Sequence, residues 1–342
     1  MEKLHFDTDY MRGAHPLILQ RLCDTNMEQT PGYGTDKYTQ RAKELIREAC
    51  GSPHATVFYM VGGTQTNATV IDGLLKRHQG VVCADTGHIN VHEAGAVEAT
   101  GHKVLTLPNH EGKIDSGELE RYFASFYADD TYEHMVEPGM VYISYPTEYG
   151  TLYSLEELLE IKKVCEKYKV PLYMDGARLG YGLAASQSVT LKQIAEICDI
   201  FYIGGTKVGA LFGEAVVVPN GRFPLPTVPL VKMHGGLLAK GRLLGLQFET
   251  LFTDGLYQDI SRNAIYTAMK LKEGFMKKGF QPFIDSPTNQ QFFCLPNEVI
   301  DKLLEIATFE YWGPRGEASS IVRFVTDWGT ESSAIDRLLE KI

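Results

Sequence analysis

The chain has 342 residues, a length that predicts about two domains and a core large enough to be stable without disulfide or metal cross-links. Hydrophobic residues make up 44% and charged residues 22%, close to the averages of about 45–50% and about 25% for globular proteins, which excludes a disordered or fibrous chain. The 33 basic and 43 acidic residues give a net charge of −10. Such an acidic surface repels phosphate backbones, so we expect no nucleic-acid partner.

The sequence has no pattern typical of a membrane span or of a secretory signal. No apolar run reaches the roughly 18–20 residues that a membrane-spanning helix needs, so we expect no membrane partner. The N-terminal residues Met-Glu-Lys-Leu-His-Phe-Asp differ from the basic start and apolar stretch of a secretory signal. The six cysteines are widely spaced, without a C-x-x-C pair, which is typical of reduced thiols. We therefore expect a cytoplasmic protein.

Short apolar runs alternate with segments of helical spacing over the first two thirds of the chain. They predict a helix over 36–50, a strand over 55–61, a helix over 67–77, strands over 81–84, 103–107 and 140–145, a helix over 154–169, a strand over 170–175, a helix over 191–198, and strands over 199–203 and 215–218. Ser154, with Glu157 three residues later, is typical of a helix N-cap. Alternating helices and nearly continuous apolar strands predict an α/β domain with a mostly parallel central sheet.

The C-terminal part has a different pattern. A proline-rich stretch over 219–229 breaks the alternation, and residues 237–278 are largely of helical type. Strands over 291–295 and 320–326 and helices over 298–307 and 332–339 then predict a small α+β unit. We expect two domains, a large one over 1–245 that includes the N-terminal segment and a small one over 246–342.

In such a sheet, sites form beyond the carboxyl ends of the strands, so the residues that follow each predicted strand are candidates. They are Gly62-Gly63-Thr64, Asp85 with His88, Thr147 with Glu148, Asp175-Gly176-Ala177-Arg178, and Gly204-Gly205-Thr206-Lys207.

Lys207 follows a predicted strand, two glycines and a threonine, and the next charged residue is Glu214. Burial in such a context lowers the pKa of a lysine, and the neutral amine can form a Schiff base with a carbonyl. The alternative is an ordinary lysine that extends to solvent at a strand end.

Asp175 ends a strand 32 residues before Lys207. A Schiff-base lysine, combined with an aspartate that keeps a pyridine nitrogen protonated, is the arrangement that binds pyridoxal 5′-phosphate. Gly62-Gly63-Thr64 precedes a predicted helix, and the free amides at a helix N-terminus bind anions such as phosphate. Taken singly, the aspartate and the glycines are equally compatible with ordinary turns.

His88 and His92 are four residues apart, with Glu93 beside them, and Asp85 lies nearby in the sequence. On a helix the two histidines would share a face and could bind a metal, which would favour a metal-dependent hydrolase. No third ligand is identified, and we expect no metal. The competing interpretation places the flat imidazole of His88 against a cofactor ring.

Together these motifs resemble the low-specificity threonine aldolase and β-eliminating lyase family, pyridoxal phosphate enzymes of the aspartate aminotransferase fold (fold type I). The resemblance extends from about Phe6 to the C-terminus. The matching stretches are 6–9, 33–36, 62–67, 87–89, 93–95, 175–179, 204–207 and 322–326. It implies a pyridoxal-phosphate-dependent transferase-like large domain and a small C-terminal α+β domain.

The resemblance also implies roles for individual residues. Lys207 would bind pyridoxal phosphate as a Schiff base, Asp175 would bind the pyridine nitrogen, and His88 would stack on the ring. Gly63, Thr64 and Thr206 would contact the phosphate. Arg178, Arg323 and Thr8 would lie near the substrate carboxylate, with Arg178 also close to the cofactor.

The chain departs from the family pattern in two places. Glu148 takes the place of a second active-site histidine and could act as a base. The family's Gly-Gly-Gly-Met-Arg loop reads Gly-Gly-Leu-Leu-Ala-Lys-Gly-Arg over 235–242, so Lys240 or Arg242 would reach a neighbouring subunit's site.

The resemblance implies a carbon–carbon lyase that cleaves a β-hydroxy amino acid, such as L-threonine or L-allo-threonine, to glycine and an aldehyde. Glu148, His88 or a water would take the proton of the β-hydroxyl. The alternatives are β-elimination or transamination on the same frame, and a metal-dependent hydrolase that uses His88 and His92. We expect a homodimer or homotetramer that binds a small amino-acid substrate.

Overall fold

The computed structural model describes residues 3–221, 225 and 227–342. The described chain forms a seven-stranded sheet with the strand order β2-β8-β7-β6-β5-β3-β4. Its strands are β2 (Thr56–Met60), β3 (Gln79–Ala84), β4 (Val104–Leu107), β5 (Glu137–Ser144), β6 (Leu172–Asp175), β7 (Ile200–Gly204) and β8 (Glu214–Val218). Only β8 among these runs antiparallel to its neighbours β2 and β7. This confirms the predicted α/β fold with a mostly parallel sheet.

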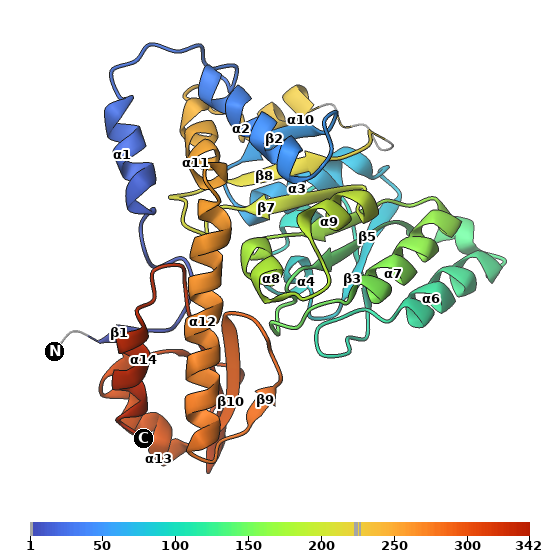
Figure 1. Ribbon diagram of the computed structural model, residues 1–342. Coiled ribbons are helices and arrows are strands. Elements are labelled where there is room, and N and C mark those ends of the chain that lie inside the picture. The colour runs from blue at the N-terminus through green and yellow to red at the C-terminus, as the bar shows by residue number, and fades with distance from the viewer. Residues whose placement is uncertain (1–2, 222–224, 226) are drawn as a thin grey trace.

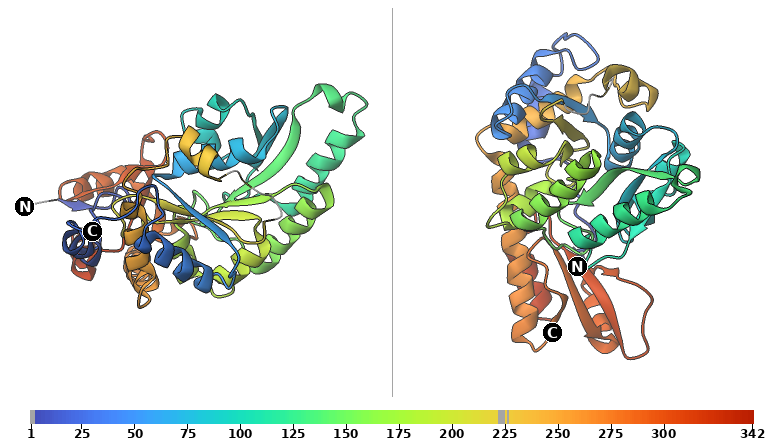
Figure 2. Two further views of the ribbon diagram at one scale, coloured as in Figure 1. Left: turned by 90° about the horizontal axis from the view of Figure 1, so that it is seen from above. Right: turned by 90° about the vertical axis from the view of Figure 1, so that its right-hand side faces the viewer.

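Both faces of the large sheet are covered by helices, as Figure 1 and the turned views of Figure 2 show. The alternation along β2 illustrates why: Val57 and Tyr59 pack into one apolar cluster, and Phe58 and Met60 pack into the cluster on the opposite face. Helices that cover the first face include α2 (Lys37–Ala49), α6 (Ser116–Ala128), α7 (Leu155–Tyr168), α8 (Leu179–Ala185), α9 (Leu191–Ile197) and α11 (Arg242–Phe252). The second face is covered by α3 (Gly63–Leu74), α4 (His88–Val91), α5 (Ala96–Ala99) and α10 (Thr227–Met233).

Helix α12 (Leu256–Lys277) extends from the large sheet to a separate C-terminal unit (Figure 1). A four-stranded antiparallel sheet in that unit has the order β12-β13-β10-β9. Its core joins Phe275 of α12 with Phe293 and Phe324 of the sheet. The elements are β9 (Pro282–Ile284), β10 (Gln290–Pro296), α13 (Asn297–Leu304), β11 (Ala307–Thr308), β12 (Glu310–Tyr311), β13 (Ser319–Val325) and α14 (Ser332–Leu339).

The N-terminal segment connects the two parts of the molecule. Strand β1 (Leu4–His5) pairs in parallel with β11 of the C-terminal unit, whereas helix α1 (Pro16–Asp24) packs on α11 beside the large sheet. The expected boundary at residue 245 falls inside α11, and the division into two domains stays a prediction. None of the helices among the described residues is long and apolar enough to cross a membrane.

Most predicted elements are present, with shifted ends. Helix α3 begins at Gly63 rather than at residue 67, because the extended Gly62 is its N-cap. The helix α6 and the N-terminal helix α1 were not predicted. Part of the proline-rich break, at 222–224 and 226, lies outside the described residues, as do residues 1–2. All six cysteines are free thiols, and Cys23 and Cys294 are exposed.

The N-terminus of helix α7 shows how a local sequence motif fixes the start of a helix. Ser154 Oγ accepts from Glu157 N at 3.1 Å, and a Glu157 carboxylate oxygen accepts from Ser154 N at 2.6 Å, which completes the predicted capping box. Replacing Ser154 with alanine removes one of these bonds and is expected to lower the free energy of unfolding by about 1 kcal/mol. Urea unfolding monitored by circular dichroism measures this loss. Ser154→Thr, which keeps the hydroxyl, should lose clearly less; equal losses would contradict the capping role.

Candidate active site

Two adjoining hollows lie beyond the carboxyl ends of the strands of the large sheet. The first, the sheet hollow, has a volume of about 270 Å³ and is lined by residues that follow β2, β3, β5, β6 and β7. The second, the small-domain hollow, has a volume of about 310 Å³ and extends to β10, β12 and β13. They share the lining residues Tyr10, His88, Glu148, Arg178 and Lys207.

Most of the residues singled out in the sequence meet at these hollows. The sheet hollow is lined by Gly63, Thr64, His88, Glu148, Asp175, Arg178, Thr206 and Lys207. Arg323 lines the small-domain hollow. Thr8 instead lines a different cavity, together with Arg12 and Asp327. Lys240 and Arg242 are absent from the described linings of both hollows, and Arg242 donates to the backbone oxygen of Thr25 at 2.6 Å.

Close backbone packing brings the Asp175 and Lys207 turns together. Strands β6 and β7 are neighbours, and Gly204 N, at the end of β7, donates to Gly176 O, just after β6, at 2.9 Å. A Cβ atom on Gly176 would lie 1.8 Å from Tyr202 O, and one on Gly204 would lie 2.2 Å from Ala177 O. Glycine is therefore required at both positions, which explains the glycines of the two motifs.

Asp175 is a buried carboxylate whose two oxygens each accept two hydrogen bonds. Tyr202 and Ala177 N donate to Oδ1 at 2.6 and 3.0 Å, and Tyr142 and Asn67 donate to Oδ2 at 2.7 and 3.0 Å. Burial raises the pKa of this group, but the charge of His88 and the hydrogen bonds from Tyr202, Ala177 and Asn67 outweigh it, so the pKa is lowered. Asp175 thus keeps its negative charge inside the protein.

His88 is oriented by a second buried carboxylate. Its Nδ1 lies 2.8 Å from Oε1 of Glu93, which also accepts from Asn67 Nδ2 at 2.7 Å. Asn67 therefore bridges Glu93 and Asp175, and Tyr173 donates to its Oδ1 at 2.7 Å. Because a carboxylate only accepts, Nδ1 of the imidazole carries a hydrogen and donates it to Glu93.

Glu148 lies beside His88, on the loop that follows β5. Its Oε1 accepts from His88 N at 2.9 Å and from Ser144 Oγ at 2.7 Å. Burial raises the pKa of Glu148, and the bond from Ser144 opposes this only in part. A carboxylate with a raised pKa can exchange a proton nearer neutral pH than an ordinary glutamate, as a catalytic base requires.

Lys207 has an anchored backbone and an unpaired amine. Tyr181 donates to its backbone oxygen at 2.6 Å, whereas its Nζ takes part in no hydrogen bond with the described residues and lies 5.9 Å from the centre of the Tyr10 ring. Burial and the positive charge of Arg178 lower the pKa of the Lys207 amine. A lowered pKa favours the neutral, nucleophilic form.

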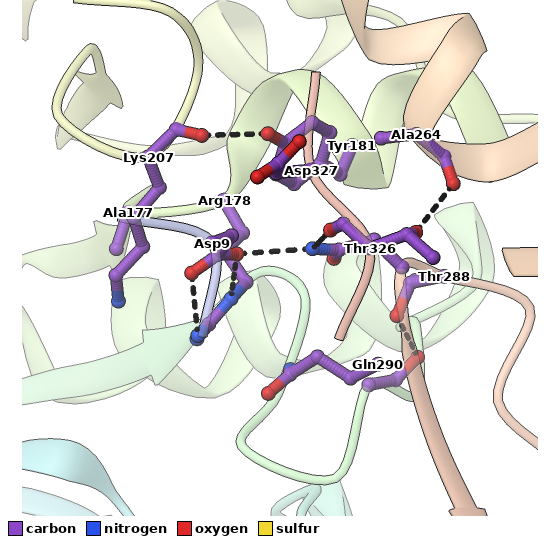
Figure 3. A network of polar contacts seen from close by, with 12 residues as sticks. Asp9, Ala177, Arg178, Tyr181, Lys207, Ala264, Thr288, Gln290, Thr326 and Asp327 are labelled. Carbon is purple, nitrogen blue, oxygen red and sulfur yellow. Dashed lines mark hydrogen bonds and ion pairs between the residues drawn. The ribbon is translucent and has the colours of Figure 1, made fainter. Parts of the chain in front are cut away.

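Arg178 is held by a residue from the N-terminal segment. Its Nε and Nη2 donate to the two carboxylate oxygens of Asp9 at 2.6 and 3.1 Å, as Figure 3 shows next to Lys207. Asn289 of the C-terminal unit also donates to Asp9, at 3.0 Å. Burial raises the pKa of Asp9, but the charges of Arg178 and Lys207 outweigh it and the pKa is lowered. This contact ties three distant segments together at the site.

The opposite end of the sheet hollow is formed by the start of α3 and by the Thr206 turn. Gly62 caps α3 without a side-chain bond, so backbone amides of the first turn, around Gly63 and Thr64, are available to an anion. Thr206 Oγ1 donates to Oε1 of Glu214 at 2.7 Å, and Gly205 N donates to Oε2 at 3.1 Å. Burial raises the pKa of Glu214 to about 8.

The sequence analysis assigned no role to Asp9, Asn67, Glu93 or Tyr202, although the first three lie within stretches that match the family. Asp9, Asn67 and Tyr202 act on partners distant in the chain, so their local sequence does not indicate these contacts. Glu214 had a signal, because it is an acid at the start of the otherwise apolar strand β8.

Comparison with known proteins agrees with this geometry. The model of the beta-eliminating lyase family matches residues 6–275. A solved structure of Leishmania major threonine aldolase is 38% identical, with a TM-score of 0.95 and 98% of both chains covered. Low specificity L-threonine aldolases of a Pseudomonas strain and of Pseudomonas aeruginosa are 26% identical over 98% of this chain and 96% of their own. Thermus thermophilus aspartate aminotransferase shares the fold, with a TM-score of 0.72 at 12% identity, covering 99% of this chain and 91% of its own.

The fold and the site therefore define a pyridoxal-phosphate-dependent enzyme of fold type I. Within that class, the chain belongs to the beta-eliminating lyase family. The donor set suits the cofactor, because one hollow is lined by a buried amine without a hydrogen-bond partner among the described residues, an ionised buried carboxylate and an open helix N-terminus.

The metal-dependent alternative is not favoured. The rings of His88 and His92 are 5.6 Å apart, and His88 Nδ1 is engaged by Glu93. Among the residues that the structure describes, no group of three or more His, Cys, Asp or Glu side chains is placed to hold a metal ion. The relatives described above are instead threonine aldolases.

Glu214 yields a prediction about stability and pH. Its pKa is raised to about 8 in the folded protein, from an ordinary value of 4.5. Between these values the folded protein retains a proton that the unfolded chain has lost, so this group makes the free energy of unfolding fall as pH rises from about 4.5 to about 8. Glu214→Gln should flatten that decline in the cofactor-free protein, as measured by urea unfolding at several pH values. A variant whose decline parallels that of the wild type would contradict the assignment.

Proposed function

We propose that this enzyme cleaves a β-hydroxy amino acid, such as L-threonine or L-allo-threonine, to glycine and an aldehyde by a retro-aldol reaction. The observation that carries the proposal is the convergence of Lys207, Asp175, His88 and Glu148 on one hollow that continues to Arg323. The similarity to Leishmania major threonine aldolase over 98% of the chain supports it.

Pyridoxal phosphate, when bound, supplies an electron sink for the charge that remains on Cα after the Cα–Cβ bond breaks. In this proposal the amine of Lys207 would hold the cofactor until a substrate amine takes its place. The ionised Asp175 would hold a proton on the pyridine nitrogen, and His88 would lie against the ring. Gly63, Thr64 and Thr206 would contact the phosphate.

Arg323 is the proposed main partner of the substrate carboxylate, with Arg178 beside it. The Nε and Nη2 atoms of Arg178 donate to Asp9, whereas the buried Nε of Arg323 has no hydrogen-bond partner among the described residues. A planar guanidinium suits a carboxylate because it can donate two parallel hydrogen bonds. Thr8 was expected to help here, but its place in another cavity gives that role no support.

Glu148 is the proposed base. It is held by Ser144 and by the backbone of His88, at the junction of the two hollows, where the β-carbon of a substrate bound between Lys207 and Arg323 would lie. Its carboxylate takes the proton of the β-hydroxyl as the Cα–Cβ bond breaks and the aldehyde forms. His88 or a water is the alternative acceptor.

The other proposals concern the setting of the enzyme. We propose a cytoplasmic homodimer or homotetramer in which Lys240 or Arg242 reaches the neighbouring subunit's site. Neither residue lines the described hollows of its own chain; Lys240 is exposed, whereas Arg242 donates to the backbone oxygens of Thr25 and Glu28 in its own chain. β-Elimination or transamination would give a keto acid rather than glycine, so product analysis separates these reactions.

Lys207→Ala tests the proposed chemistry. The wild-type enzyme with pyridoxal phosphate should release acetaldehyde and glycine from threonine or allo-threonine. The activity of the variant should be at least about 10³-fold lower, because the group that binds the cofactor is gone. The visible absorption of the protein, bleached by borohydride, should be absent from the variant. Formation of a keto acid in place of glycine and aldehyde would overturn the aldolase proposal.

Glu148→Gln tests the proposed base. Loss of a general base is expected to lower kcat by about 10²- to 10⁴-fold. A base must be ionised, so wild-type kcat should fall as pH drops through the raised pKa of Glu148, and this acidic limb should vanish in the variant. The matched control, Glu98→Gln, removes an exposed carboxylate and should retain both the wild-type kcat and its decline at low pH. If kcat still declines at low pH in Glu148→Gln, another group accepts the proton.

A further inference from the structure

Arg323 is a buried cation on β13, in the wall of the small-domain hollow. Its Nη1 donates to Gln290 Oε1 at 2.9 Å, and its Nη2 forms an ion pair with Glu310. The guanidinium carbon lies 5.1 Å from the centre of the Trp312 ring. The side chain is therefore fixed on three sides by its own unit.

The Nε atom of Arg323 is buried and finds no hydrogen-bond partner within the described chain. A buried donor without an acceptor is destabilising, so its presence points to an acceptor that arrives with a ligand. Nε and Nη2 form one edge of the guanidinium, and this edge binds a carboxylate through two parallel bonds. Asp9 fills the same edge of Arg178 completely, with bonds to both Nε and Nη2.

Glu310 fills only half of the corresponding edge of Arg323. Oε2 of Glu310 accepts a hydrogen bond from Nη2 of Arg323, while Nε of Arg323 has no partner among the described residues. Its side chain is 40% exposed, in contrast to the 11% of Arg323. It belongs to the two-residue strand β12 at the edge of the small sheet, so it can turn toward solvent without disturbing the core.

We infer that Glu310 is an internal competitor for the substrate carboxylate. It holds Nη2 of Arg323 in the free enzyme and gives way when an incoming carboxylate takes Nε and Nη2 together. Glu310 thereby sets the affinity for the amino-acid substrate without taking part in the chemistry. This inference rests on the proposed function, because it requires a substrate with a free carboxylate at Arg323.

The experiment measures the affinity of the holoenzyme for glycine, the proposed product, from the change in cofactor absorbance and by calorimetry. Glu310→Gln should bind glycine about tenfold more tightly than the wild type, because a charge-assisted intramolecular bond no longer competes. KM for threonine should fall while kcat changes little. Glu310→Ala should shift both constants in the same direction. The control Glu317→Gln removes an exposed charge from the same unit and should leave both constants unchanged.

The outcomes separate the inference from the proposal on which it rests. If the wild type binds glycine and both Glu310 variants bind it equally or more weakly, while their thermal unfolding midpoints are unchanged, the competitor role is overturned. Arg323→Gln should lose at least tenfold in glycine affinity, and retained affinity would overturn it as well. If the wild-type holoenzyme binds no glycine, the proposed function itself fails, and the inference falls with it.

Discussion

The ionised carboxylate of Asp175, buried at the end of β6, is the constraint on which the site depends. A buried charge is tolerated only when hydrogen bonds replace the lost water. Four donors do so here: the hydroxyls of Tyr142 and Tyr202, Asn67 Nδ2 and the backbone of Ala177. The strands on either side of β6 supply the two tyrosines, and α3 supplies the asparagine, so strand order and helix placement both serve this one group.

The pKa values of the acids around the hollows shift in different directions because the acids differ in the number of hydrogen-bond donors and cations beside them. Asp175 and Asp9 have several donors or adjacent cations, and their pKa values are lowered. Glu148 and Glu214 accept hydrogen bonds from fewer donors, and their pKa values are raised. This separation lets one site contain carboxylates with lowered pKa values, which keep their charge, and carboxylates with raised pKa values, which take up a proton more readily.

The site also depends on contacts between parts of the molecule. Asp9 comes from the N-terminal segment, Arg178 from the turn between β6 and α8, and Asn289 from the C-terminal unit. The N-terminal strand β1 pairs with β11, which brings this segment across the C-terminal unit on its way to the site. The small-domain hollow is thus lined by residues of both parts of the molecule, with Arg323 supplied by the C-terminal unit.

Hydrophobic periodicity and cap residues determined most elements in the sequence, as the capping box of α7 and the unshifted bounds of α14 illustrate. The sequence also indicated that Asp175, Lys207, His88 and Glu148 would share one edge, because parallel strands present their carboxyl ends together. Only the tertiary structure decided which partners these residues have. Arg178 and Asp9 are 169 residues apart, and Asp9 and Asn289 are 280 apart, so no local spacing encodes those contacts. The tertiary structure likewise decided the direction of each carboxylate's pKa shift, because this direction depends on how many hydrogen-bond donors the folded chain brings to a buried group.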